Sequence, residues 1–314
     1  MTQAEKLLVI VGPTGSGKSS LGLEAAEALG GEIVSADAFA VYRGLDIGTD
    51  KPSPEARRRV RHHLVDVADP HQRFSAGDFA AAADEAIATI RTRGKLPLVV
   101  GGTHFYVRAL VLGLFPSPAH DAELRARLEQ RWEEDPAALH RRLEQVDPDS
   151  AARIAPADRQ RILRALEVFE LTGEALSSHW RRHRRPPRYD ALLVAPQRSR
   201  DELYARINQR VEFMFTGGLV DEVARILASG VAPKSHALKA IGYREVVGYL
   251  EGRHSLASAR SETQRSSRRL AKRQLTWLRT LREGRLQWVE PAERGGTVAL
   301  MELWNTHTKG SGKP

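Results

Sequence analysis

Residues 7–19 read Leu7-Leu8-Val9-Ile10-Val11-Gly12-Pro13-Thr14-Gly15-Ser16-Gly17-Lys18-Ser19, an apolar run followed by a glycine-rich loop that ends in Lys-Ser. The loop matches G-x-x-x-x-G-K-[ST], which is typical of a strand, a phosphate-binding loop and a helix in succession. Glycine at positions 12 and 17 lets the backbone curl around an anion, where a Cβ atom would obstruct it. Lys18 adds a positive charge, the following helix directs its positive dipole end at the same oxygens, and Ser19 offers a hydroxyl to Mg²⁺. The stretch predicts that a polyphosphate binds residues Gly12, Pro13, Thr14, Gly15, Ser16, Gly17, Lys18 and Ser19.

On the amino side of this stretch, Met1–Lys6 contains no secretory signal, and no apolar run in the chain approaches the length of a membrane span. We therefore expect a cytoplasmic protein with no membrane partner. The chain has no cysteine, which excludes disulfides and thiolate metal sites. Its 314 residues, 41% of them hydrophobic, are enough for one large α/β domain and an appendage.

The charge balance favours a nucleic-acid partner. Lys and Arg number 48 against 39 Asp and Glu, which gives a formal net charge of +9. A positive surface attracts phosphate backbones without reading their sequence. The charge alone does not decide the partner.

Two further strand ends are predicted to lie beside the phosphate loop. The strand at Glu32–Asp37 ends in a carboxylate, and the strand at Leu96–Val100 ends in Gly101-Gly102-Thr103. Because parallel strands present their carboxyl ends at one edge of a sheet, Asp37 should face the polyphosphate. Its alternative role is to cap a helix or to hydrogen-bond to a group that itself binds Mg²⁺. An ATPase loop usually has a neighbouring strand that ends in Asp, to hold Mg²⁺ and a water molecule. Two glycines and a hydroxyl instead favour a site that stabilises a departing diphosphate.

Beyond the phosphate loop the pattern alternates between strands and helices. A helix is predicted over residues 20–29, a short strand over His62–Val67, and a helix from Phe79 to Arg93. His62 and His63 are neighbours on a strand and point to opposite faces, so they are not expected to bind one metal ion.

The middle of the chain lacks strand signals. From residue 116 to residue 188, Arg, Glu and Ala dominate and prolines divide the segment into short helices, which predicts an all-helical insertion domain. The amphipathic stretch Gln160–Phe169 carries arginines that either contact RNA or form a solvated face. The basic run His179–Arg185 is either a contact surface or a flexible linker.

A strand at Tyr189–Val194 returns the chain to the sheet, and from Asp201 onward nearly all of it reads as helix. Helices are expected over Leu203–Phe215, Leu219–Leu227, Ala237–Leu250 and Ala257–Arg282, and the tail from Asn305 is expected to be disordered. The last helix is rich in arginine, which favours contact with a phosphate backbone over mere solubility. The predicted fold is α/β, a P-loop-type parallel sheet flanked by helices with an all-helical insertion. Its parts are residues 1–115, 116–188, 189–304 and 305–314.

Several motifs in order now resemble the tRNA dimethylallyltransferase family. They are residues 12–19, Ser35-Ala36-Asp37, the segment 41–49 (Val-Tyr-Arg-Gly-Leu-Asp-Ile-Gly-Thr), Gly101-Gly102-Thr103, the segment 160–167 (Gln-Arg-Ile-Leu-Arg-Ala-Leu-Glu), Ala240-Ile241-Gly242-Tyr243-Arg244 and Lys272-Arg273-Gln274-Leu275-Thr276-Trp277. The resemblance runs from the first strand to about Arg282. It implies an enzyme that, with Mg²⁺ held at Ser19, transfers a dimethylallyl group from its diphosphate to N6 of the adenosine 3′ of the tRNA anticodon.

The resemblance also implies residue roles and a monomer that binds the anticodon stem-loop. Asp37 would be the catalytic base, Lys18 and Thr103 would neutralise the departing diphosphate, and Arg210 would bind that diphosphate. The implied tRNA contacts are Asp37, Ala38, Phe39, Ala40, Thr103, Arg125, Gln160, Arg161, Ile162, Leu163, Arg164, Lys239, Gly242, Tyr243, Arg244, Lys272, Arg273, Gln274, Trp277 and Arg279.

The chain departs from the family after Asp37. The family usually has serine, a variable residue and glutamine there, whereas this chain has Ala38-Phe39-Ala40. The resemblance therefore implies retained prenyl transfer with weaker or altered tRNA preference. Two other functions remain open from the residues: a small-molecule kinase, which would use the same loop for ATP, and a non-catalytic RNA-binding relative.

Overall fold

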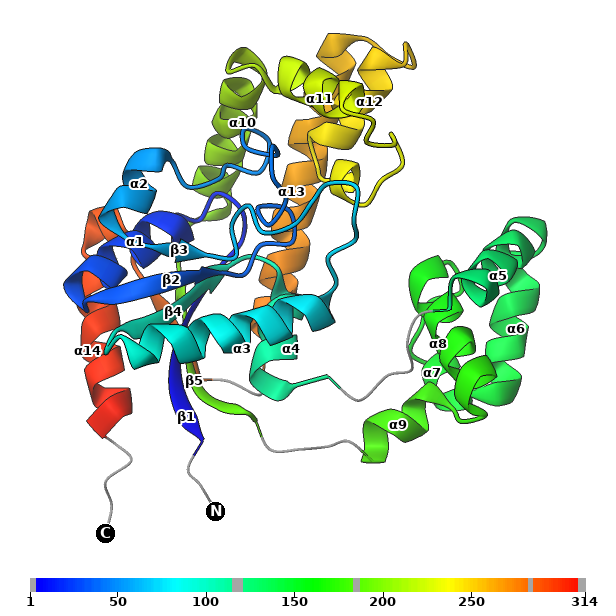
Figure 1. Cartoon of the computed structure of the whole chain (residues 1–314), viewed down its shortest axis with the longest axis horizontal. Coiled ribbons are helices and arrows are strands. Elements are labelled where there is room, and N and C mark those ends of the chain that lie inside the picture. The colour runs from blue at the N-terminus through cyan, green and yellow to red at the C-terminus, as the bar shows by residue number, and fades with distance from the viewer. Residues whose placement is uncertain (1–3, 115–120, 183–186, 282–284, 310–314) are drawn as a thin grey trace. The chain divides into compact units, whose positions relative to one another are not determined.

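The computed structural model describes residues 4–114, 121–182, 187–281 and 285–309. The chain divides into two compact units, which Figure 1 shows as ribbons. The core unit comprises Met1–Leu112 and Pro187–Pro314, and the insertion unit comprises Gly113–Pro186. The insertion unit covers most of the segment that the sequence predicts as a separate helical domain.

A parallel sheet forms the centre of the core unit. Its strands are β1 (Glu5–Val11), β2 (Gly31–Ser35), β3 (His62–His63), β4 (Leu96–Gly101), β5 (Tyr189–Pro196) and β6 (Arg285–Val289). In the part of the chain that is described they lie in the order β3-β2-β4-β1-β5-β6, and every adjacent pair is parallel. The segments that follow β1, β2 and β4 therefore leave the sheet at the same edge, side by side.

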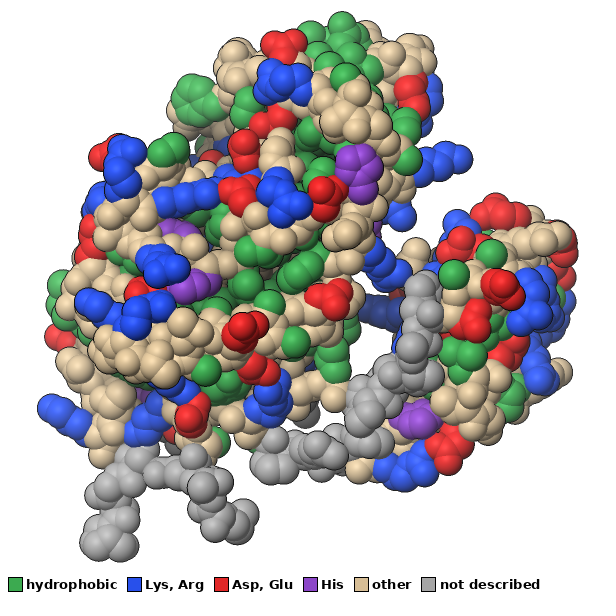
Figure 2. Space-filling model, in the orientation of Figure 1, with side chains coloured by type: hydrophobic (Ala, Val, Ile, Leu, Met, Phe, Trp, Pro, Cys, Tyr) green, Lys and Arg blue, Asp and Glu red, His purple; other side chains and the backbone are tan. Residues whose placement is uncertain are grey.

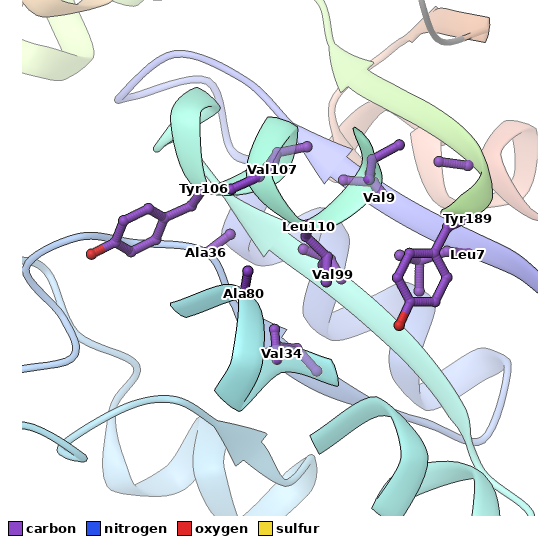
Figure 3. Packing of buried hydrophobic residues seen from close by; sticks show 14 of the residues in the cluster. Leu7, Val9, Val34, Ala36, Ala80, Val99, Tyr106, Val107, Leu110 and Tyr189 are labelled. Atoms are coloured by element: carbon purple, nitrogen blue, oxygen red, sulfur yellow. The ribbon is translucent and has the colours of Figure 1, made fainter. Parts of the chain in front are cut away.

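Helices cover both faces of this sheet. The helices of the core unit are α1 (Lys18–Ala28), α2 (Pro54–Arg59), α3 (Ala76–Thr92), α4 (His104–Leu112), α10 (Arg200–Thr216), α11 (Leu219–Ala228), η1 (Ala237–Lys239), α12 (Tyr243–Leu250), α13 (Leu256–Thr280), η2 (Ala292–Arg294) and α14 (Gly296–Lys309). Along β1 the side chains alternate: Leu7 and Val9 pack with α3 and α4, whereas Leu8 and Ile10 pack with α1 and α14. Figure 3 shows the first of these clusters, with Leu110 beside the strand residues.

A third hydrophobic cluster lies beyond the sheet edge. It joins the segment after β2 to α10, α11 and α12, with Tyr42 and Tyr243 fully buried in it. Burial of side chains of this size stabilises the fold by about 1.5–3 kcal/mol each. This cluster fixes the position of α10 relative to the strand ends, and thus the position of the arginines that α10 carries.

The insertion unit is helical throughout its described residues. Its helices are α5 (Ala122–Glu134), α6 (Pro136–Val146), α7 (Pro148–Ala151), α8 (Arg159–Thr172) and α9 (Leu176–Arg182). Pro136 and Pro148 stand in the first turns of α6 and α7, where the missing N–H has no helical partner to lose. Asp135 and Asp147 cap these two helices through their side chains. The prolines therefore start helices here, which agrees with the predicted division into short helices.

Two elements at the carboxyl end differ from the predictions. Most of the described chain after Asp201 is helical as expected, but the prediction misses β6, which pairs with β5 along the edge of the sheet. The expectation of a disordered tail from Asn305 is wrong for Asn305–Lys309, which belong to α14. Burial of Trp304 and His307 anchors this helix, and the Nζ of Lys6 donates to the carbonyl of His307 at 2.9 Å. The remaining tail residues lie outside the described part of the chain.

Two other predicted elements are shorter than expected. The strand predicted over His62–Val67 ends at His63, because Leu64 and Asp66 have φ of 60° and 61° and leave the extended region. The helix predicted over Ala237–Leu250 is divided into η1 and α12. Gly242, with φ of 95°, stands between them in a conformation that an L residue rarely adopts.

Candidate functional site

The phosphate loop connects β1 to α1, and its backbone takes conformations that favour glycine. Gly15 and Gly17 have φ of 81° and 92°. A Cβ atom on Gly12 would lie 2.6 Å from the Oγ of Ser16, so only glycine fits there. That Oγ is buried and has no hydrogen-bond partner. Helix α1 begins at Lys18, so its free N–H groups lie at the end of the loop, as an anion site requires.

Lys18 is partly buried at the start of α1, and the charges around it define the site. Burial lowers the pKa of Lys18, and the charge of Arg210 lowers it further, whereas Asp37 and Asp50 raise it. Two cations and two carboxylates, from four different segments, thus act on the same small region. The sequence predicts Lys18, Arg210 and Asp37 at this site: Lys18 and Arg210 line one cavity at the phosphate loop, and Asp37 lies just after β2, outside the lining of that cavity.

Arginines from after β5 hold the loop from outside. The Nη1 of Arg210 donates to the Oγ1 of Thr14 at 3.0 Å and lies 3.3 Å from the Oδ2 of Asp50. The Nε of Arg206 donates to the carbonyl of Gly15 at 3.0 Å, and the Nε of Arg198 donates to the carbonyl of Ser16 at 2.9 Å. Sequence reasoning finds Arg210 only through the family resemblance. It misses Arg198 and Arg206, because no local pattern marks a side chain that reaches a loop almost two hundred residues away.

A cavity of about 870 Å³ opens beside the loop and α10. It is large enough for a diphosphate with a short apolar chain. Its lining joins cations to an apolar side formed by Ile47, Phe213 and Met214. The charged residues along it are Lys18, Asp46, Asp50, Lys51, Arg57, Asp66, Arg206 and Arg210.

Asp37 and Thr103 lie at adjacent strand ends and are held by the backbone. The Oδ1 of Asp37 accepts from the N–H groups of Phe39 and Ala40, at 2.9 and 3.1 Å. The Oγ1 of Thr103 accepts from the N–H of Ala38 at 2.9 Å, so its own hydrogen remains available to another acceptor. These bonds hold one carboxylate oxygen of Asp37 in a turn. They also hold the hydroxyl of Thr103 against the backbone of Ala38, the residue that follows Asp37.

The glycines before Thr103 allow these strand ends to approach. A Cβ atom on Gly101 would lie 2.1 Å from the carbonyl of Ala36, and one on Gly102 would lie 2.8 Å from the Nε2 of Gln274. The backbone at the end of β4 therefore lies close to the segment after β2 and to α13.

Helix α13 contacts both loops of the site. The Oε1 of Gln274 accepts from the N–H of Thr14 at 2.9 Å, and its Nε2 donates to the carbonyl of Gly102 at 2.8 Å. One turn later, Trp277 stacks on His104 with ring centroids 4.0 Å apart. Burial, with the charge of Lys18, lowers the pKa of the His104 imidazole to about 4, so the ring is neutral near pH 7. The sequence predicts Gln274 and Trp277 as RNA contacts and misses their role in holding the two loops.

Some of the predicted tRNA contacts of the core unit are exposed, and others are buried. Lys239, Arg244, Lys272, Arg273 and Arg279 are exposed. On the face in Figure 2, Lys and Arg side chains are interspersed with Asp and Glu, so the net charge does not gather in one patch there.

Four predicted contacts in this part of the chain are buried instead: Ala40, Gln274, Gly242 and Tyr243. Tyr243 has no exposed surface, and its hydroxyl donates to Glu222 at 2.5 Å and accepts from the N–H of Gly48 at 3.2 Å. Gly242 is also buried. Tyr243 therefore holds the loop at Gly48 in place. Because Gly242 and Tyr243 are both buried, neither belongs to the RNA-binding surface proposed below.

In the insertion unit, α8 presents polar residues on one side and core residues on the other. Ile162 and Leu163 are fully buried, which removes them from any contact surface. Gln160 and Arg161 are exposed. The Nη2 of Arg125 donates to the Oε1 of Gln160 at 3.1 Å. Arg164 is partly buried and donates to the carboxylate of Glu167 at 2.8 Å.

The described residues contain no group of three or more His, Asp or Glu side chains that could hold a metal ion by themselves. His63 bonds to Glu32 at 2.7 Å and His62 to the carbonyl of Val60 at 2.8 Å, so each has a structural partner. Within the same ranges, no helix is both long and apolar enough to cross a membrane.

Comparisons with known proteins are consistent with this geometry. A family model described as IPP transferase matches residues 40–281. The tRNA dimethylallyltransferase of Geobacter sulfurreducens is 51% identical over 287 residues, which span 91% of this chain and 92% of that protein. The full-length tRNA isopentenylpyrophosphate transferase from Bacillus halodurans has a similar structure, with a TM-score of 0.73, 36% identity and coverage of 98% of both chains. A eukaryotic dimethylallyltransferase solved acting on tRNA gives a TM-score of 0.83 at 25% identity, over 99% of this chain and 81% of that one.

Proposed function

The chain belongs to the IPP transferase family, and we propose that its phosphate loop and Asp37 together prenylate an adenosine in the anticodon loop of tRNA. It is an enzyme that transfers a dimethylallyl group to tRNA. The acceptor we propose is N6 of the adenosine on the 3′ side of the anticodon, and the second product is diphosphate. The observation that carries this proposal is the phosphate loop with Arg210 bonded to Thr14, next to the strand end where the segment of Asp37 bonds to Thr103.

The phosphate loop and its arginine bind the leaving group. Dimethylallyl diphosphate places its diphosphate on the N–H groups at the start of α1, against Lys18 and Arg210. Its five-carbon chain is short enough for the apolar side of the cavity. Positive groups fixed in position before the reaction stabilise the charge that grows on the diphosphate as it departs.

Asp37 acts on the nucleophile. The N6 amine of adenine is a weak nucleophile because its lone pair is delocalised into the ring. As N6 forms a bond to C1 of the allyl group, the C1–O bond breaks and its electron pair leaves on the diphosphate. Asp37 then accepts the proton that N6 loses. One carboxylate oxygen of Asp37 is held by Phe39 and Ala40, which fixes the direction of the other.

The donor set fits Mg²⁺ bound jointly by protein and substrate. Magnesium usually binds to one or two protein oxygens and to substrate phosphates, keeping several waters, so a cage of three carboxylates is not needed. The hydroxyl of the exposed residue Ser19 would hold it. When bound, the ion neutralises part of the diphosphate charge.

The tRNA lies on the exposed cations of η1, α12 and α13. An anticodon loop is single-stranded at its apex, so little energy is needed to turn the target adenine out of its stack toward Asp37. We propose that Lys239, Arg244, Lys272, Arg273 and Arg279 bind the RNA backbone and that one chain suffices. Exposed Gln160 and Arg161 of the insertion unit add contacts of their own. A tRNA substrate also makes the cytoplasm the proposed place of action.

Ala38 and Ala40 leave the base site with fewer polar side chains than the family pattern supplies. Asp37 and Thr103 remain, so we propose that prenyl transfer is retained with altered tRNA preference.

The test incubates the protein with Mg²⁺, dimethylallyl diphosphate and total tRNA, followed by nucleoside mass spectrometry. The proposal expects N6-dimethylallyl adenosine, and it expects none when the diphosphate is omitted. The alternative function, a small-molecule kinase whose loop binds ATP, would be favoured by a different result. In that case every tRNA would keep unmodified adenosine, and the protein would phosphorylate a small metabolite with ATP.

A further inference from the structure

We infer that α13 couples RNA binding to the diphosphate site, and that Gln274 is the positioning residue through which this coupling acts. The inference rests on the proposed function, because it assumes that RNA binds α13 and that a diphosphate binds the loop. It adds that the two substrates bind cooperatively, through contacts made within the protein.

Gln274 connects the two loops that form the site. Its amide accepts a hydrogen bond from Thr14 in the phosphate loop and donates one to Gly102 in the loop after β4. The side chain is 8% exposed, and a Cβ on Gly102 would lie 2.8 Å from its Nε2. One buried amide therefore sets the separation of the anion loop from the residue next to Thr103.

A second contact prevents α13 from moving away from the same loop. Trp277, one turn after Gln274, stacks on His104, the residue that follows Thr103. Thr103 thus lies between two residues, Gly102 and His104, that each contact α13. A shift of this helix would displace both its hydrogen bond and its ring contact.

The same helix is tied to the third part of the anion site. The Nη1 of Arg268 donates to the Oδ1 of Asn208 at 2.6 Å, and the Nε2 of Gln264 donates to the Oε1 of Glu212 at 2.8 Å. Asn208 and Glu212 lie on α10 on either side of Arg210, which donates to Thr14. Helix α13 therefore positions Thr14 from two directions, directly and through α10.

The outer side of α13 carries exposed charge immediately beside this buried contact. Lys272 and Arg273 precede Gln274 in sequence and are exposed. RNA phosphates bound there restrain the backbone that carries Gln274. The helix and both loops then have less conformational freedom left, so they lose less of it when diphosphate binds. Rigidity gained from the first ligand lowers the entropic cost of the second, and linkage makes the effect reciprocal.

The experiment measures the affinity of an unreactive donor, the analogue of dimethylallyl diphosphate with sulfur as the bridging atom, with and without a saturating anticodon stem-loop RNA. In the unaltered chain, RNA should tighten analogue binding by about tenfold, a typical size for coupling between sites. Gln274→Met keeps the length of the side chain and removes both hydrogen bonds, so the ratio should fall to about one. Gln274→Glu keeps only the acceptor for Thr14 and should give a value between these two.

Gln287→Met is the matched control, because it makes the same substitution at an exposed position on β6, away from α13 and α10. Its ratio should equal that of the unaltered chain, and thermal unfolding of each variant should confirm that it folds. A Lys272→Ala, Arg273→Ala variant should bind RNA more weakly and show a smaller ratio even when saturated, because the RNA no longer restrains the backbone beside Gln274.

Equal ratios in Gln274→Met and the unaltered chain would overturn the inference, as would a ratio of one in the unaltered chain. If the unaltered chain transfers no prenyl group to any tRNA, the proposed function itself is wrong. The two failures are therefore distinguishable.

Discussion

Lys18 is the residue on which the anion site most depends, and its environment makes its charge sensitive to pH. Burial lowers its pKa below the ordinary 10.5, so in the free enzyme its charge is lost at a lower pH than in a free lysine. We predict that kcat/KM for dimethylallyl diphosphate falls on the alkaline side before pH 10.5. Lys18→Ala should lower kcat/KM by about 10²–10³-fold, as loss of one fixed positive donor does.

A pH–rate profile of Lys18→Arg checks this assignment. Arginine keeps its charge, so the alkaline fall should move to higher pH even though the altered geometry lowers the rate. An unchanged alkaline limb in this variant would assign the fall to another group.

His104 gives a second prediction, on stability. Its pKa is about 4 in the folded chain, against an ordinary value of 6.5. The unfolded chain binds the proton more tightly, so the stability from the neutral ring is complete above about pH 6.5 and is lost as pH falls toward 4. His104→Phe should keep the stack on Trp277 and remove this dependence. The free energy of unfolding, measured in urea at pH 7 and pH 4.5, should differ less in the variant, by roughly 1–2 kcal/mol, a value reduced because the ring is partly exposed.

At the scale of single residues, the sequence predicts a role where that role depends on neighbouring residues in the chain. The loop from Gly12 to Ser19 is a contiguous motif, so its function could be read directly. The roles of Arg198, Arg206 and Gln274 depend on contacts with residues far away in the chain, and nothing near them in sequence indicates those contacts. The same limit explains why Tyr243 was expected at a surface and lies in the core.

Between η1 and α12, one glycine determines where the second helix begins. Gly242 has φ of 95°, and a Cβ there would have 3.4 Å to its nearest neighbour, so the cost of a substitution is conformational rather than a clash. Gly242→Ala should lower the free energy of unfolding by roughly 1–3 kcal/mol. The control is Gly77→Ala in the first turn of α3, where alanine favours the helix and should be neutral or stabilising. Equal effects of the two variants in urea unfolding would contradict this account.

Sequence patterns predict helices and strands well where the hydrophobic residues keep one spacing along the whole element. Strand β1 with its alternating core residues and α10 with its capping box at Ser199 and Glu202 are both recognisable. Strand β6 was missed because it is a five-residue edge strand that gains its partner only when β5 is placed. Helix α14 lies beyond the last predicted helix and was missed because Trp304 and His307 are stabilised by tertiary contacts, not by helix propensity.

Across the whole molecule, the excess of positive charge should appear in the salt dependence of RNA binding. Each Lys or Arg that contacts an RNA phosphate contributes roughly 0.7–0.9 to the slope of log K against log salt. Replacing both Lys272 and Arg273 with alanine should therefore reduce the magnitude of the slope by about 1.5. The control is Lys95→Ala, an exposed lysine just before β4, at the opposite edge of the sheet from the site. Fluorescence anisotropy of a labelled anticodon stem-loop measures both slopes, and a similar slope for both variants would remove α13 from the proposed RNA surface.

The claim that the phosphate loop and Asp37 form one catalytic site is tested most directly by Asp37→Asn. Asparagine retains an oxygen that can accept from Phe39 and Ala40, so the turn should persist while the basic carboxylate is lost. The measurement is the rate at which N6-dimethylallyl adenosine forms in an anticodon stem-loop, by nucleoside mass spectrometry, with exposed Asp201→Asn as the control. We predict a loss of about 10²–10⁴-fold for Asp37→Asn, with unchanged binding of the donor and no loss for Asp201→Asn. Prenyl transfer at the unaltered rate in Asp37→Asn would contradict the account.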